Sequence, residues 1–381
     1  MVLMKKKCLF PFILILSLML SGCGQKAQDF SLERLENDGS GRETTQKIRE
    51  ELVSEAEGGD VDISGTEEIS ASGSTPEDIE GNAAASSAAD GQSGETDTPV
   101  VYMTTDISSD GLMTIYQALA ASPSGKIAVK LSTGEPGSNY IRTDLIGELV
   151  QTLEGTIVEC NTAYGGSRAN TAMHYQVAED HGYTAIADVD IMDEDGSMTL
   201  PVTGGDNLTE NYVGAHFADY DYYVVLSHFK GHAMAGFGGA IKNISIGIAS
   251  SEGKSHIHSG GTGGSMWGGD QDAFLESMAE AGKSVVDYLD GKILYINVMN
   301  RLSVDCDCDG SPAEPDMHDI GILASYDPVA LDQACVDLVY GAEDGQSLID
   351  RIESRNGLHT LKQAEKIGLG SREYELVNID D

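Results

Sequence analysis

Two apolar stretches decide the fold: Asp221–Ser227, which reads DYYVVLS, and Lys292–Val298, which reads KILYINV. Both are rich in β-branched and aromatic residues and show no alternation with polar residues, which is typical of strands buried on both faces of a sheet. Working outward, the sequence predicts further strands at Lys126–Leu131 (KIAVKL), Thr156–Cys160 (TIVEC) and Ile320–Ser325.

Helices are predicted between these strands. Thr143–Leu153 carries apolar residues at helical spacing and has Thr143 as its expected N-cap. Ser167–His181 is expected to be helical, and Asp327–Tyr340 has Pro328 in its first turn, where proline is favoured. The alternation predicts an α/β fold: a mostly parallel sheet with helices on both faces, in one large domain or two lobes.

The N-terminus has the pattern of a bacterial lipoprotein. Met1–Gly22 combines a positive start, Lys5–Lys7, with an apolar run too short to span a membrane comfortably. Leu20-Ser21-Gly22-Cys23 then matches a lipobox, so we expect cleavage before Cys23 and a lipid on its thiol. This predicts an extracytoplasmic protein anchored to the cell membrane, with an unmodified secretory peptide or an uncleaved anchor as the alternatives.

Residues 23–100 are expected to be an acidic tether, followed by the α/β domain at residues 101–381. Between residues 24 and 100 there are 19 acidic and 5 basic residues, and Phe30 is the only aromatic one. Such a composition cannot bury enough apolar area to offset the entropy of ordering. The whole chain has a net charge of −39, which excludes nucleic acid as a partner and makes the lipid the expected membrane contact.

Ligands of parallel α/β sheets bind beyond the carboxyl ends of the strands. The unusual polar clusters of this sequence all follow predicted strands, in the following loops: Ser132–Tyr140, Asn161–Arg168, His228–Lys242, Asn300–Pro312 and Ser325–Pro328. We therefore expect one site, built by these loops. The sequence predicts neither its substrate nor the oligomeric state.

The richest cluster follows the strand Asp221–Ser227. His228, His232 and Lys242 are the predicted catalytic residues. Gly238 and Gly239, with Lys242, are predicted to bind a cofactor, because bare backbone N–H groups bind anions and the missing Cβ atoms admit a flat ligand. The alternative is a glycine-rich turn with solvated histidines.

Two further segments are predicted to bind a small anion or an anionic cofactor. Lys130 lies at the end of its strand. Gly165, Gly166 and Ser167 are predicted to bind an oxyanion at a helix N-terminus, with Arg168 as a bidentate clamp. The alternative for this second segment is a tight connection from strand to helix.

Candidate metal ligands lie in two places. His256 and His258 are expected on one face of a strand, where imidazoles suit a divalent transition metal. Cys306 and Cys308 are separated by one residue, which leaves a disulfide, a metal site and structural thiols as three open alternatives.

Taken together, these segments resemble the family named domain of unknown function 362. The resemblance covers roughly residues 101–381 and rests on the following segments: Val129–Leu131, Gly134–Gly137, Asn161–Thr162, Tyr164–Arg168, Val225–His232, Gly236–Asn243, Asp305–Cys308, Asp319–Ser325 and Asp327–Ala330. Members are commonly labelled iron–sulfur proteins because many carry a ferredoxin-like insert. This chain has no C-x-x-C-x-x-C run, and Ser259–Asp272 stands where the insert is expected, so an iron–sulfur cluster is not predicted.

The stretch from His232 to His258 is also similar to the nickel-pincer lactate racemase family. That resemblance implies an acid/base role for His232, a covalent cofactor attachment at Lys242 and a nickel ligand at His258. The chain departs from the family at Ala240-Ile241, where a Gly-Arg pair is usual, and the second catalytic base has no evident counterpart.

The sequence thus predicts a membrane-tethered, extracytoplasmic protein with a metal- or cofactor-binding site. Its expected cofactor is a nickel-pincer-type nucleotide or a divalent metal ion, and its expected activity is isomerase- or racemase-like, or redox, on a small oxyanion such as a hydroxy acid. The alternatives are a non-catalytic metal or ligand carrier, an iron–sulfur redox protein of the kind that the family label suggests, and a purely structural surface protein.

Overall fold

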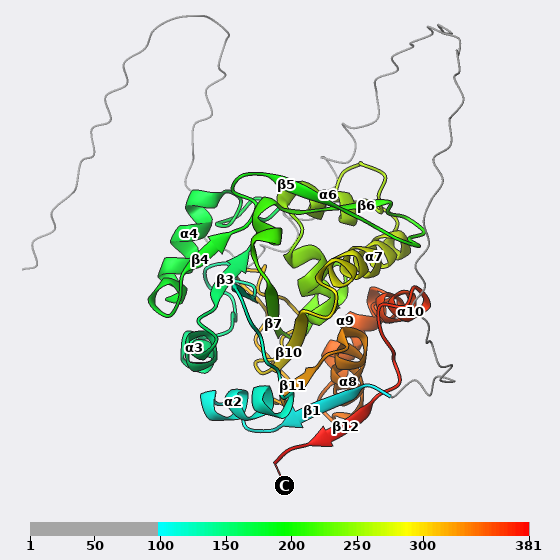
Figure 1. Cartoon of the computed structure of the whole chain (residues 1–381). Helices are drawn as coiled ribbons and strands as arrows, with labels where there is room; N and C mark the ends of the chain where they lie inside the picture. The colour runs from blue at the N-terminus through cyan, green and yellow to red at the C-terminus, as the bar shows by residue number, and fades with distance from the viewer. Residues whose placement is uncertain (1–97, 381) are drawn as a thin grey trace, which may run out of the picture. The chain divides into compact units, whose positions relative to one another are not determined.

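The computed structural model describes residues 98–380, which are drawn in colour in Figure 1. The predicted signal peptide, the lipidated Cys23 and nearly all of the acidic tether lie outside the described residues and remain predictions. The described residues belong to one compact unit and do not divide into two lobes. None of the helices within residues 98–380 has the length and apolarity needed to cross a membrane.

A sheet of eight strands forms the centre of the molecule (Figure 1). In spatial order the strands are β12 (Glu375–Asn378), β1 (Val100–Thr104), β11 (Gly321–Ser325), β10 (Ile293–Met299), β7 (Tyr222–His228), β2 (Ile127–Lys130), β3 (Thr156–Glu159) and β4 (Val189–Ile191). Every neighbouring pair is parallel except the two that β11 makes with β1 and β10. The predicted α/β fold with a mostly parallel sheet is therefore confirmed.

Helices cover both faces of the sheet, as predicted (Figure 1). Along β7, Val224 and Leu226 pack on one side and Tyr223 and Val225 on the other, so this strand has no polar face. The first face carries α2 (Ser109–Ala118), α3 (Thr143–Thr152) and α4 (Thr171–Asp180). The second carries α5 (Ala240–Lys242), α7 (Gln271–Leu289), α8 (Pro328–Gly341), α9 (Gln346–Ser354) and α10 (Leu358–Lys366).

Several local predictions were wrong. The helix expected from Ser167 begins only at Thr171, because the Asn170 side chain accepts from the Met173 N–H and caps it there. Thr143 is the first residue of α3 rather than its N-cap, and the N-cap Arg142 makes no capping bond with its side chain. Asp327, by contrast, caps α8 by accepting from the backbone N–H groups of Val329 and Ala330.

The direction of β11 also corrects one predicted site loop. A parallel strand needs a crossover connection, usually a helix, but residues 300–320 contain none and the chain returns antiparallel to β10. Because β11 runs antiparallel to its neighbours, its carboxyl end, Ser325–Pro328, lies at the other end of the strands from the carboxyl ends of β2, β3 and β7. That loop does not contribute to the same site as the other four.

Several short elements were not predicted from the sequence. They are the hairpins β5 (Ser197–Pro201) with β6 (Glu210–Gly214) and β8 (Lys230–His232) with β9 (Gly236–Gly238), a π-helical turn at Asn243–Gly247, α6 (Ser251–His258), and the 3-10 turns Tyr183–Ala185 and Ala215–Asp219. The β8–β9 hairpin and the π-helical turn lie on either side of α5, which ends at Lys242. A π-helical turn is rare and often marks a functional position.

Candidate functional site

The carboxyl ends of β2, β3 and β7 border a cavity of about 560 Å³. The last residues of these strands, Lys130, Glu159 and His228, line it. The rest of the lining comes from the β8–β9 hairpin, α5, the π-helical turn, α6 and the loop after β10. This volume suits a small molecule or a cofactor. Four of the five loops expected to form the site therefore contribute residues to one cavity.

Three lysines on the wall of this cavity have no carboxylate partner among the described residues. Lys130 is fully buried, and its Nζ donates to the Leu131 carbonyl at 2.8 Å and to the Asn243 Oδ1 at 2.9 Å. Lys254 Nζ donates to the Ala249 carbonyl at 2.6 Å. No hydrogen bond is made by the Lys242 ammonium within residues 98–380, and its side chain is only partly buried.

Burial changes the protonation of two of these lysines. Removal from water lowers the pKa of Lys130 to about 8, against the attraction of Glu159. Burial also lowers the pKa of Lys242 to about 8, and the positive charges of Arg168 and Lys130 act in the same direction. At pH 7 both are mainly ammonium ions, yet each keeps a neutral fraction of about one in ten. Such lysines can hold an anion and, when neutral, act as nucleophiles.

His258 faces this cavity with an available ring nitrogen. Its Nδ1–H donates to the Lys254 carbonyl at 2.7 Å, which leaves Nε2 unprotonated. Burial lowers the pKa of His258 to about 4, so the ring is neutral at pH 7. Its ring stacks on Phe274 with the centroids 4.6 Å apart, which fixes its plane. A histidine whose Nδ1–H is held by a carbonyl has the usual arrangement of a metal ligand or a base.

His232 has the opposite arrangement. Its Nδ1 accepts from the backbone N–H groups of Met234 at 3.1 Å and Ala235 at 2.9 Å. The neutral ring therefore carries its proton on Nε2. Burial, aided by the positive charge of Lys242, holds the pKa of His232 well below its usual range. These contacts make His232 a neutral hydrogen-bond donor toward the cavity and disfavour the base role expected from the sequence.

His228 lines the cavity, but both its ring nitrogens are engaged inside the protein. Nδ1 lies 3.1 Å from the Asp307 carboxylate, and Nε2 donates to the Asn300 carbonyl at 2.7 Å. Lys230 donates to the other oxygen of the same carboxylate at 2.6 Å. No ring nitrogen remains for proton transfer to a ligand, so we assign His228 to holding the loop after β10.

The segment expected to bind an oxyanion binds carboxylates of this chain instead. The Ser167 N–H donates to Glu135 at 2.9 Å, and Arg168 bridges Glu135 and Glu159, each at 3.1 Å. Gly165 and Gly166 do not stand at a helix N-terminus, because α4 begins at Thr171. The anion-binding chemistry of this loop is present, but Glu135 and Glu159 already satisfy it.

The N–H groups that follow Gly238 and Gly239 are also occupied by a carboxylate of this chain. The backbone N–H groups of Ala240 and Ile241 donate to Asp332 of α8 at 2.7 and 2.9 Å. A Cβ on Gly239 would lie 2.3 Å from an Asp332 oxygen, so glycine is needed there to admit this carboxylate. Gly238 contacts Lys242, since its Cβ would lie 3.2 Å from the lysine Cδ. These glycines position α5 and Lys242 and offer no free N–H groups at Ala240 or Ile241.

The expectation of a His256–His258 pair on one strand face was wrong. Both belong to α6, where residues two apart point in nearly opposite directions. His258 faces the cavity, whereas the ring of His256 lies against Tyr212 with the centroids 5.1 Å apart. The two rings therefore cannot share a metal ion.

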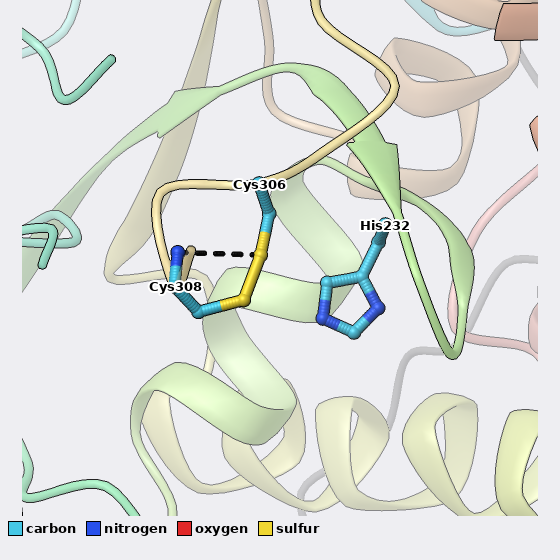
Figure 2. A group of neighbouring side chains, drawn as sticks. All are labelled: His232, Cys306 and Cys308. Atoms are coloured by element: carbon cyan, nitrogen blue, oxygen red, sulfur yellow. Dashed lines mark hydrogen bonds between the residues drawn. A yellow bond between two sulfur atoms is a disulfide. The ribbon is translucent and has the colours of Figure 1, made fainter. Parts of the chain in front are cut away.

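The structure resolves the alternatives for Cys306 and Cys308 in favour of a disulfide. Both residues line the cavity and are partly exposed. Figure 2 shows the His232 ring beside the two sulfur atoms, and one ring nitrogen and both sulfurs lie within 4.8 Å of one another. As a disulfide, this pair is not a metal site.

Several lining residues were missed by the sequence analysis. Asn243 holds Lys130, and Gly247 makes room for it, since a Cβ there would lie 2.8 Å from the lysine Nζ. Lys254 and Glu159 gave no signal beyond their charge. Trp267, the only tryptophan of the chain, also lines the cavity and is 61% exposed. Its place in the glycine-rich loop that replaces the expected insert was the one available clue.

Two solved structures are similar to this chain at low TM-scores. The lactate racemase apoprotein from Thermoanaerobacterium thermosaccharolyticum matches with a TM-score of 0.39 and 13% identity, over 62% of this chain and 56% of that one. A protein from Thermotoga maritima matches with a TM-score of 0.35 and 15% identity, over 60% and 57%. This chain thus spans little more than half the length of these neighbours, and nothing about its function follows from them. No curated protein matches.

The sequence itself gives the stronger relationship. Residues 127–337 match the domain of unknown function DUF362. The matched segment runs from β2 to α8, and so includes all the elements that form the cavity. It covers more than half of the chain and confirms the resemblance stated from the sequence. The protein therefore belongs to the DUF362 family.

Proposed function

We propose that the cavity binds a small organic anion, such as a hydroxy acid, and that the protein acts at the outer face of the cell membrane. The observation that carries the proposal is the convergence of Lys130, Lys242 and Lys254, without carboxylate partners among the described residues, in a chain of net charge −39. Unpaired ammonium groups are costly to bury. A bound anion would supply the missing countercharge.

Lys242 and His258 also fit the cofactor that the resemblance to nickel-pincer lactate racemases implies. Lys242 is partly neutral at pH 7 and has no competing partner among the described residues, as covalent attachment requires. His258 offers an unprotonated Nε2, as metal ligation requires. When bound, such a group would supply a metal centre for racemase-like chemistry.

The alternative is a carrier that binds the same anion without converting it. It is favoured by the engagement of His228 with Asp307 and Asn300, because this removes one of the predicted acid/base residues. Turnover distinguishes the two. An enzyme interconverts the two enantiomers of lactate in the presence of its cofactor, and we expect His258→Ala to abolish this activity. A carrier binds lactate but does not interconvert its enantiomers.

Anion binding is testable through Trp267, because the only tryptophan of the chain lines the cavity. The full chain is titrated with lactate, and separately with inorganic phosphate, while the tryptophan fluorescence is recorded. We expect saturable binding of at least one anion, weakened at least tenfold in Lys242→Met. Lys283→Met is the matched control, since Lys283 pairs with Asp287 on the surface of α7 and should bind as the wild type does. Equal affinities of Lys242→Met and the wild type would refute the proposed site.

The cofactor is tested separately on natively purified protein. Mass spectrometry of the peptide that contains Lys242 is expected to show a covalent adduct, and elemental analysis is expected to find stoichiometric nickel. An unmodified, metal-free protein that still interconverts lactate enantiomers would exclude this cofactor.

A further inference from the structure

The Cys306–Cys308 disulfide lies at the cavity and has no part in the anion site proposed above. It closes a loop of three residues, after β10, whose middle residue is Asp307. Both half-cystines are partly exposed and line the cavity, so a small molecule that enters the cavity can reach the sulfur atoms. A bond that served only to stabilise the core would not need this access.

One N–H group donates to these sulfur atoms, and a second lies beside them. The Cys308 N–H donates to the Cys306 Sγ at 3.3 Å, the contact drawn as a dashed line in Figure 2. The second is the Nε2–H of His232, whose ring lies beside the disulfide. Because Nδ1 accepts from two backbone amides, the proton of the neutral ring is on Nε2. Hydrogen-bond donors of this kind stabilise a thiolate more than a thiol or a disulfide.

The same two amides argue against a metal ion between His232 and the two cysteines. A metal on Nε2 would require the ring to carry its proton on Nδ1 or to become an imidazolate. A proton on Nδ1 would face the N–H groups of Met234 and Ala235, which lie 3.1 and 2.9 Å away. Metal-bound histidines normally donate from their second nitrogen, whereas this one accepts.

The acidic residues around the loop are largely compensated. The Asp307 carboxylate is held by Lys230 at 2.6 Å and by His228 at 3.1 Å, and the ion pair of Asp305 with Arg351 is 3.1 Å long. Asp309 is exposed to water, and its side chain accepts from the Ser311 N–H at 2.8 Å. A thiolate at Cys306 would therefore form beside neutral donors and paired carboxylates.

We propose that Cys306 and Cys308 form a reversible two-electron redox centre that exchanges with small thiols entering the cavity, with Cys306 as the stabilised thiolate. A thiolate of a dithiol reductant attacks one sulfur and breaks the Cys306–Cys308 bond, forming a mixed disulfide. The second thiol of the reductant then attacks the reductant's sulfur in that mixed disulfide and releases the remaining protein sulfur. The reductant leaves as a cyclic disulfide, and the protein gains two electrons and two protons. His232 is a positioning residue that stabilises the released thiolate.

The other cysteines of the described region do not compete in this chemistry. Cys160 and Cys335 are fully buried and not disulfide-bonded. Burial raises the pKa of Cys160 to about 12 and raises that of Cys335 well above its usual range, so neither is a reactive thiolate near neutral pH. Peptide-level mass spectrometry separates the pair from all the remaining cysteines.

The experiment equilibrates the folded full chain with mixtures of reduced and oxidised dithiothreitol, and alkylates the thiols with iodoacetamide. We expect the peptide that contains Cys306 and Cys308 to pass from unmodified to doubly alkylated in a single two-electron transition, and back again on oxidation. In the reduced protein, Cys306 should be alkylated faster than Cys308 at pH 7. A pair that stays oxidised in a large excess of reduced dithiothreitol, without denaturant, would overturn the proposal.

Variants of His232 test its part in the centre. His232→Phe should slow the alkylation of Cys306 at pH 7 about tenfold and shift its pH profile upward by about one unit. His232→Gln, which keeps a donor near the Nε2 position, should restore most of the rate, and His256→Phe is the matched control on α6 that should change nothing. Equal rates in all variants would remove His232 from the centre. Stoichiometric Zn²⁺ held by the reduced wild type but lost in His232→Phe would overturn its assignment as a donor.

Discussion

At the scale of single residues, the evidence for an anion site is a group of positive charges that no carboxylate of the described residues neutralises. Glu159 is held by Arg168 and His174, and Asp307 is held by Lys230 and His228. Among the described residues, Lys130, Lys242 and Lys254 are not compensated in this way. Isolated buried ions are rare because of their desolvation cost. Three unpaired ammonium groups at one cavity, two of them on the buried side chains of Lys130 and Lys254, therefore indicate a ligand more strongly than the composition of the lining does.

The lowered pKa values of Lys130 and Lys242 predict how lactate binding depends on pH. Both lysines are charged below their pKa of about 8 and lose their protons as the pH rises through it. Lactate keeps its own charge over this range. We expect its affinity to fall about tenfold or more between pH 7 and pH 9, and the fall to be smaller in Lys242→Met. The titration monitored by Trp267 fluorescence measures this, and a flat profile would contradict a direct role of these lysines.

Lys242 should also reduce the stability of the empty protein. Its pKa falls from 10.5 to about 8 because burial disfavours the ammonium form. Since the side chain is partly exposed to the cavity, we expect Lys242→Met to raise the free energy of unfolding by only about 1 kcal/mol at pH 7. The gain should persist at lower pH and disappear as the pH rises from about 8 toward 10.5, where the unfolded chain also loses this proton.

Urea denaturation of the two proteins at pH 7 and at pH 10 measures this difference. Lys283→Met again serves as the control, because its surface ion pair is worth no more than about 0.5 kcal/mol. A destabilised Lys242→Met would mean that the lysine has a favourable partner in the folded state.

At this scale the sequence predicted the residue types of the site well and their contacts poorly. Lys242, His232 and His258 all reach the cavity, as their density in the sequence indicated. The glycine-rich segments had the right chemistry, but Glu135 and Asp332 already occupy their N–H groups. Both carboxylates come from distant parts of the chain, so local sequence gave no sign of them.

At the scale of elements, the apolar strands were predictable because a strand buried on both faces needs a run of apolar residues. The five predicted strands are present as β2, β3, β7, β10 and β11, with ends shifted by one residue. The edge strand β12 was not predictable, because its residues are mostly exposed. His256 and His258 were expected on a strand, but the Ser250 side chain accepts from the Gly253 N–H and starts the helix α6, which contains both histidines.

The β8 strand and the loop that carries the disulfide depend on a glycine for their contact. A Cβ on Gly231 would lie 2.3 Å from the Val304 carbonyl oxygen, and the Gly231 N–H donates to the Ser303 carbonyl at 2.9 Å. Backbone cannot yield as a flexible side chain does, so Gly231→Ala must separate the two segments. We expect it to lower the free energy of unfolding by about 2 kcal/mol or more, as measured by urea denaturation.

The control for this substitution is Gly165→Ala. Gly165 is exposed, and nothing lies within 4 Å of where its Cβ would be. Its stability should stay within about 0.5 kcal/mol of the wild type. If Gly231→Ala were equally neutral, β8 would not be in contact with the loop that carries Cys306 and Cys308.

At the scale of the whole molecule, the charge of the chain and the charge of the cavity have opposite signs. A net charge of −39 repels anionic lipid headgroups as well as nucleic acid, so electrostatic attraction does not hold this protein on a membrane. The proposed membrane location therefore depends on the lipid expected at Cys23, which lies outside the described residues.

This anchor is tested by the N-terminal mass of the protein made in a bacterial host. Wild type is expected to begin at Cys23 and to carry acyl chains, whereas Cys23→Ala should lack them and retain residues 1–22, because cleavage requires the modified cysteine. Simple fractionation would not separate the two, since an uncleaved apolar leader also holds a protein at the membrane. Cys8→Ala is the matched control, because Cys8 leaves with the leader, and it should mature as the wild type does. A wild-type protein that is cleaved but carries no lipid would contradict the proposed anchor, because the protein would then be secreted and not tethered to the membrane.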